Sequence, residues 1–132
     1  VRHLIIGDNS TIVLSGKSFK NLEEITFLSI KTFKGKVLNR IDSVKKLTFW
    51  YENGKSNTFI AMFPKLVELI VNNGSIVELD LTKNPLLETL NLNRCSKLEK
   101  IILKSSQNLK KVLVQNSKKL DLSNLGDNVK TI

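Results

Sequence analysis

Apolar residues recur along this chain at an interval of 21 or 22 residues, always within the same short pattern, L-x-x-L-x-L. The fourth and sixth positions of each unit are two residues apart, so an extended chain would point both to the same side. Six units follow one another from Val1, and a seventh begins at Val129. The pattern predicts a short β-strand with one apolar face in every unit. The fourth position holds Leu4, Ile25, Leu47, Leu69, Leu90 and Val112, and the sixth holds Ile6, Phe27, Phe49, Val71, Leu92 and Val114.

A second copy of the pattern lies about halfway between the main units in the C-terminal half, over residues 76–81 and again over residues 98–103. This spacing predicts a coil with two short extended segments, one on each side of a flattened tube. Successive coils would stack at about 4.8 Å, the distance between neighbouring strands. One coil cannot bury its own apolar row, but six or seven stacked coils can.

The best unit, SIVELDLTKNPLLETLNLNRC over residues 75–95, resembles the leucine-rich repeat, whose pattern continues L-x-x-L-x-L-x-x-N/C. The 21–22-residue period is similar to that of bacterial repeats, including the BspA-like cell-surface proteins. Ile30, Glu52 and Gly74 depart from the family's asparagine ladder at the ninth position. Small polar residues able to satisfy backbone groups at a turn hold other ninth positions, namely Asn9, Asn84, Cys95, Ser106 and Ser117.

The resemblance implies a mainly β fold, a right-handed leucine-rich-repeat solenoid of about six coils with a parallel β-sheet on one face. Short strands or 3₁₀ turns would form the other side. We expect one domain over residues 1–132, with irregular coils over 1–65 and regular coils over 66–132, and we expect it to be part of a longer protein. All eight aromatic residues lie at or before Phe63, in half-coils that are longer and less regular.

Charge first suggests a polyanion-binding protein, since the formal net charge is +9. On the predicted strands, however, charges alternate from coil to coil, as in Glu24, Lys46 and Glu68, which indicates cross-strand pairs that stabilise the sheet. The surplus lysines fall in turns, where they either aid solubility or, at Lys97, Lys104 and Lys118, bind a polyanion. No aromatic residue accompanies these lysines, so a nucleic-acid partner is not expected.

Catalytic chemistry has little support in the sequence. His3 is the only histidine and Cys95 the only cysteine, so neither a zinc site nor a disulfide framework is expected. Gly16-Lys17-Ser18 and Gly54-Lys55-Ser56 match only the end of a phosphate-binding loop and are assigned to turns. Cys95 is expected to be buried. We therefore predict neither an enzyme nor a cofactor, and the apolar runs are too short for a membrane span.

The stronger functional signal is apolar surface on the outer side of the predicted strands. If positions four and six point inward, positions three, five and seven point outward, and these include Leu28, Trp50 and Ile70. Exposed apolar residues that lie together often form a contact surface. A flanking domain or another segment could equally cover them, or the strand register could slip there. The predicted contact residues are Thr26, Leu28, Lys46, Thr48, Trp50, Glu68 and Ile70.

Three functions remain open from the sequence. The resemblance favours a non-catalytic module that binds a protein or glycan, within an extracellular or cell-surface protein of a bacterium. The first alternative is a structural spacer or capping segment of a longer solenoid. The second is a polyanion binder that uses the lysine-rich C-terminal coils.

Overall fold

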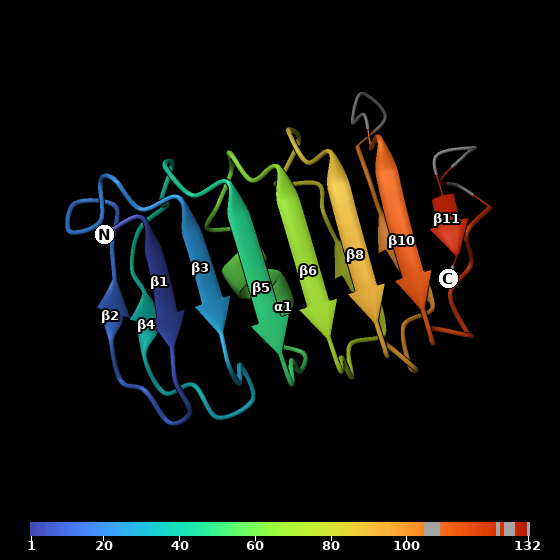
Figure 1. Ribbon diagram of the computed structural model, residues 1–132, viewed down its shortest axis with the longest axis horizontal. Coiled ribbons are helices and arrows are strands. Elements are labelled where there is room, and N and C mark those ends of the chain that lie inside the picture. Colours follow the sequence, from blue (N-terminus) through green and yellow to red (C-terminus); the bar gives the residue numbers. More distant parts are fainter. Residues whose placement is uncertain (105–108, 124, 126–128, 132) are drawn as a thin grey trace.

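The computed structural model describes residues 1–104, 109–123, 125 and 129–131, and the chain is mainly β, with parallel strands stacked as a β-solenoid that repeats about every 22 residues (Figure 1). The main sheet follows the order β1-β3-β5-β6-β8-β10-β11, and every neighbouring pair in it is parallel. Its strands are β1 (His3–Ile6), β3 (Glu24–Phe27), β5 (Lys46–Trp50), β6 (Glu68–Asn72), β8 (Thr89–Asn93), β10 (Lys111–Gln115) and β11 (Val129–Thr131).

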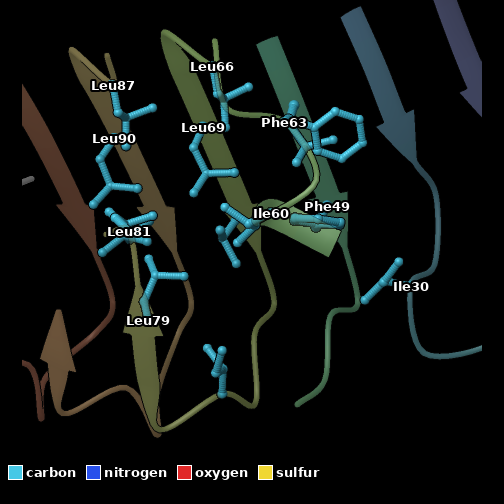
Figure 2. Close-up of a cluster of buried hydrophobic side chains, with 14 of the residues drawn as sticks. Ile30, Phe49, Ile60, Phe63, Leu66, Leu69, Leu79, Leu81, Leu87 and Leu90 are labelled. Atoms are coloured by element: carbon cyan, nitrogen blue, oxygen red, sulfur yellow. The ribbon is translucent and has the colours of Figure 1, made fainter. Parts of the chain in front are cut away.

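From β1 to β10 the register of the main sheet stacks equivalent residues of successive coils, as the sequence pattern predicts. The prediction is wrong for the last strand, because Val129, expected to begin a seventh unit, pairs with the fourth-position residue Val112. Leu47, Leu69 and Leu90 are direct partners across β5, β6 and β8, and all three are fully buried. Figure 2 shows Leu69 and Leu90 pointing into the same interior as Leu79 and Leu81, which come from the opposite side of the coil. The predicted burial of the fourth and sixth positions is confirmed for every coil from Ile25 to Val114. Neighbouring coils thus bury apolar rows that a single coil would expose.

In the part of the chain that the structure describes, the opposite side of the solenoid carries two short parallel sheets and one helix. The intermediate row predicted in the C-terminal half is confirmed, since Leu79 and Ile101 are partners in one of these sheets. The N-terminal half also has a two-stranded sheet where looser strands or 3₁₀ turns were expected. The elements of this side are β2 (Val13–Leu14), β4 (Lys36–Val37), α1 (Ser56–Ile60), β7 (Glu78–Asp80) and β9 (Lys100–Ile102).

The helix α1 is an element that the apolar period did not predict, and its start depends on polar side chains. Glu52 Oε2 accepts a hydrogen bond from Ser56 Oγ at 2.8 Å. Asn53 Oδ1 accepts another from the backbone N–H of Lys55 at 2.9 Å. These local contacts turn the chain just after β5 and favour a helix over an extended segment. In this way α1 brings Ile60 into the core.

Aromatic side chains fill the wider N-terminal coils. Phe27 and Phe49, from neighbouring main strands, stack with ring centroids 5.4 Å apart. Phe33 and Phe59 come from the opposite side and meet Phe27 at 5.1 and 5.6 Å respectively. Because an aromatic ring occupies more volume than leucine, the longer half-coils before Phe63 still enclose a filled core.

Two buried polar side chains join successive coils at their turns. Asn84 donates from Nδ2 to the backbone oxygens of Ile60 and Phe63, at 2.8 and 3.0 Å. Glu52, at the ninth position of its coil, accepts a hydrogen bond from the backbone N–H of Ile76 in the next coil. Glu52 therefore replaces the asparagine of the ladder with a longer acceptor, although the sequence suggested only an interruption. Ser106, another predicted ladder residue, lies outside the described residues.

Candidate functional site on the outer face of the main sheet

One row of charged side chains lies along the outer face of the main sheet, at the start of its strands. Lys46 Nζ lies 3.9 Å from Glu24 Oε2 and 3.9 Å from Glu68 Oε1, so it bridges two neighbouring strands. His3 Nε2 lies 3.6 Å from the same Glu24 oxygen and 3.0 Å from Thr26 Oγ1. The predicted alternation of charges is thus present, with contacts typical of partly exposed pairs that each contribute well under about 1 kcal/mol.

Apolar side chains lie exposed at the other end of the same strands. Trp50 is 39% exposed, and Leu28 is 43% exposed. The register that pairs Phe27 with Phe49 places Leu28 next to Trp50, as the sequence predicts. Ile5, two coils from Trp50, is exposed as well. No segment of the described residues covers Leu28 and Trp50.

Tyr51 extends this apolar surface and was not predicted from the sequence. Tyr51 is 55% exposed, and the centroid of its ring lies 6.4 Å from that of Trp50. We call Leu28, Trp50 and Tyr51 together the aromatic edge. Exposed aromatic side chains that lie together provide a large contact area at a low entropic cost, which is why they are common in binding surfaces.

The backbone of Tyr51 is in a left-handed conformation, with φ of 50°. The residues at the same place in the following coils, Asn73, Arg94 and Asn116, have φ of 55° or 56°, so the turn itself requires this conformation. Asparagine adopts it readily, whereas a bulky side chain adopts it at a cost. Tyr51 is therefore a poor residue for its turn. The sequence alone does not give this signal, because the eighth positions of the units differ widely: Asp8, Ser29, Tyr51, Asn73, Arg94 and Asn116.

The structure brings the predicted contact residues onto one face but exposes them unequally. Leu28 and Trp50 are exposed, while Thr26, Lys46, Glu68 and Ile70 are half-buried. Thr48 lies between Thr26 and Ile70 in the register and is only 8% exposed. Alternation along a strand predicts the side to which Thr48 points, but neighbouring side chains cover most of its surface.

Amide side chains continue the row of Trp50 toward the C-terminal coils. Asn72 is the direct partner of Trp50, and Asn93 is the partner of Asn72. Asn93 Nδ2 donates a hydrogen bond to Asn72 Oδ1 at 2.8 Å, so the two amides form a short ladder. Gln115 follows on the next strand and is exposed. Asn72 is only 7% exposed, so Asn93 and Gln115 provide most of the accessible amide surface. An amide group both donates and accepts hydrogen bonds, which suits a ligand rich in hydroxyl or amide groups.

The three lysines of the polyanion hypothesis lie in different places. Lys97 and Lys118 are exposed in the turns that follow β8 and β10. Lys104 follows β9, which belongs to the opposite side of the solenoid. The polyanion hypothesis therefore draws on lysines from both sides of the solenoid.

Cys95 is buried, as the sequence predicts. Burial, together with the neighbouring charge of Glu52, raises the pKa of its thiol to about 11. Cys95 Sγ lies 3.7 Å from the backbone oxygens of both Val71 and Asn93. The thiol can donate a weak hydrogen bond to either oxygen. A protonated, buried thiol is a poor nucleophile, so Cys95 has a structural place at the turn.

Within the described ranges, no three histidine, cysteine, aspartate or glutamate side chains gather as a metal site would require. Nor does any helix among those residues have the length and apolar character needed to cross a membrane. No family model, curated protein or solved structure matches the chain.

Proposed function

We propose that this chain is a non-catalytic binding module that holds a protein or glycan ligand on the outer face of its main sheet. The observation that carries the proposal is the aromatic edge, in which Tyr51 occupies a left-handed position next to exposed Trp50. A residue that costs folding free energy at its position is often retained for a function. A surface with no binding role would gain stability from asparagine there.

The neighbourhood of Trp50 supports a ligand that is partly apolar and partly polar. An aromatic ring can lie against the apolar face of a sugar or an apolar peptide side chain. Asn93, two strands further along, could then bind a polar group of the ligand. The amide groups of Asn93 and Gln115 favour a glycan, while the exposed Leu28 suits either class of ligand.

The leucine-rich-repeat resemblance extends this proposal to a setting. A binding module of this type would belong to a bacterial protein that is secreted or displayed at the cell surface, flanked by further repeats or domains. The stacked parallel strands support the repeat assignment, because every coil from Ile25 to Val114 places its apolar residues as the repeat pattern requires.

The single tryptophan offers a direct test, because Trp50 is the only source of tryptophan fluorescence in the chain. We would titrate the protein with a panel of neutral oligosaccharides and with a panel of extended peptides while recording this emission. The proposal expects a saturable change with a member of one panel. Leu28→Ala should weaken that binding about tenfold or more, the loss typical of a residue central to a contact.

Leu86→Ala is the matched control, since Leu86 is also an exposed leucine but lies in the turn before β8. Its affinity should equal that of the unsubstituted protein. If no member of either panel changes the emission, the binding proposal fails and the spacer alternative replaces it. If Leu28→Ala and Leu86→Ala weaken binding equally, the aromatic edge is not the site.

A further inference from the structure

A basic hollow lies where the chain enters β3 and β5, at the opposite end of these strands from Trp50. One part of it has a volume of about 380 Å³ and is lined by Lys17, Lys20 and Arg40. The adjoining part, of about 500 Å³, is lined by Arg2, Lys20 and Lys45. Lys20 and Ser43 line both parts, so the two parts adjoin, and all five basic residues that line them are exposed. Volumes of this size are within the usual range for small-molecule sites.

The two loops that form the basic hollow are held together by their backbones. A Cβ atom added to Gly16 would lie 2.7 Å from the carbonyl oxygen of Arg40, which is too close for any side chain. Ser43 Oγ donates a hydrogen bond to the carbonyl oxygen of Phe19 at 3.2 Å. Lys17 and Lys20 therefore extend from a loop that packs directly on the loop of Arg40 and Lys45, and Arg2 extends from the segment before β1. Because the backbones of the two loops are already arranged before binding, less free energy is lost when a ligand enters.

The positive charge of the basic hollow is poorly balanced. Only two carboxylates, Glu23 and Asp42, line it beside the five cations. The structure describes residues 1–104 without a gap. Within this range, ion pairs join His3 to Glu24 and Lys46 to Glu24 and Glu68. None of these pairs includes a cation of the hollow. Cations that lie close together without partners repel one another, so a bound anion would stabilise this arrangement.

We infer that the basic hollow binds a sulfate or phosphate group, either as a free ion or as an ester on a small ligand. Arg40 can form two parallel hydrogen bonds to such a group, and Lys17 and Lys20 add point charges from the neighbouring loop. The amide of Asn39, which also lines the hollow, offers a neutral donor. This inference uses residues other than those of the aromatic edge and stands apart from the proposed function.

The test is an NMR titration of the isotope-labelled full chain with sodium sulfate, sodium phosphate and a sulfated disaccharide, at an ionic strength held constant with sodium chloride. We expect saturable shifts confined to the amides of residues 2, 16–23 and 39–45, the segments that line the hollow. Lys20→Gln and Arg40→Gln should each weaken the affinity about tenfold or more, the loss expected for one charge-assisted contact. Tighter binding of the disaccharide than of free ions would identify the ester as the source, and the reverse order would identify the free ion.

The double substitution Lys118→Gln and Lys119→Gln is the matched control, because it removes the same kind of charge from exposed positions beyond β10. Its affinity should stay within about twofold of the unsubstituted protein, since screening limits charge effects over such a distance. The inference is overturned if the shifts do not saturate or are spread over the molecule. It is also overturned if the control weakens binding as much as Lys20→Gln, which would indicate general attraction by net charge. Unchanged spectra of each variant without ligand establish that it is folded.

Discussion

The carboxylate of Glu52 accepts a hydrogen bond at 2.8 Å from the backbone N–H of Ile76, one coil further along the solenoid. Its other oxygen accepts a hydrogen bond from Ser56 Oγ at the start of α1. Glu52 is only 2% exposed, so its buried carboxylate connects the start of α1 to the turn of the next coil. The glycine of the next coil makes room for it, because a Cβ atom on Gly74 would lie 2.5 Å from Glu52 Oε1. Two departures from the repeat pattern thus explain each other.

Glu52→Ala should lower the free energy of unfolding by about 2–3 kcal/mol, because it leaves the buried N–H of Ile76 without an acceptor. Urea denaturation would measure the change. Glu52→Gln keeps one carbonyl oxygen and should cost less. Glu99→Ala, at an exposed position outside the basic hollow, should stay within about 0.5 kcal/mol. A loss equal to that of Glu99→Ala would contradict a bridging role for Glu52.

Burial raises the pKa of Glu52 above its ordinary value of 4.5, and the hydrogen bonds from Ile76 and Ser56 oppose this only in part. A carboxyl whose pKa is raised on folding takes up a proton more readily in the folded state. Its contribution to stability is therefore fully present below pH 4.5 and is lost as the pH rises through the folded pKa. Glutamine does not titrate. The free energy of unfolding of the unsubstituted protein, compared with that of Glu52→Gln by urea denaturation, should therefore fall as the pH rises from 4.5 through the folded pKa. A difference that is constant with pH would show that Glu52 does not titrate in this way.

Tyr51→Asn should raise the free energy of unfolding by about 1 kcal/mol, because asparagine tolerates the left-handed backbone of this turn better than tyrosine does. The reverse change, Asn73→Tyr, places tyrosine at the equivalent turn, where φ is 55°, and should lower stability by a similar amount. Chemical denaturation of both variants tests the argument. Equal stabilities for Tyr51→Asn and the unsubstituted protein would mean that the turn imposes no cost.

Cys95 should be almost inert to thiol reagents in the folded protein. Its pKa of about 11 lies two units above the ordinary 9.0, so the thiolate is about a hundredfold rarer at neutral pH. Burial of Cys95 slows its reaction further. Alkylation should be at least about a hundredfold slower in buffer than in concentrated urea, as followed by mass spectrometry. Similar rates in the two conditions would place Cys95 at the surface.

The apolar rows could be predicted from sequence because each coil repeats the same constraint. Leu47, Leu69 and Leu90 occupy equivalent positions, and only a stacked arrangement buries all three. The helix α1 escaped prediction because its half-coil has no counterpart elsewhere in the chain. Its start depends on Glu52 and Asn53, whose partners become evident only from the path of the turn.

The surface was harder to predict than the core. Alternation correctly places Trp50 and Thr48 on the outer face, but exposure depends on the neighbouring side chains, and they leave Thr48 nearly buried. The basic hollow was not predicted, since Lys20 and Arg40 are 20 residues apart and meet only because their loops are adjacent. A period identifies what is common to all coils, whereas these sites depend on what differs between them.

The most direct test of the proposed function is the affinity of Tyr51→Asn for the oligosaccharide or peptide that changes Trp50 fluorescence. The account predicts a protein that is more stable to urea and binds that ligand about tenfold or more weakly, the loss typical of a residue central to a contact. Such a result would show that Tyr51 is kept for contact at the expense of folding. Unchanged affinity in the stabilised variant would contradict a binding role for the aromatic edge.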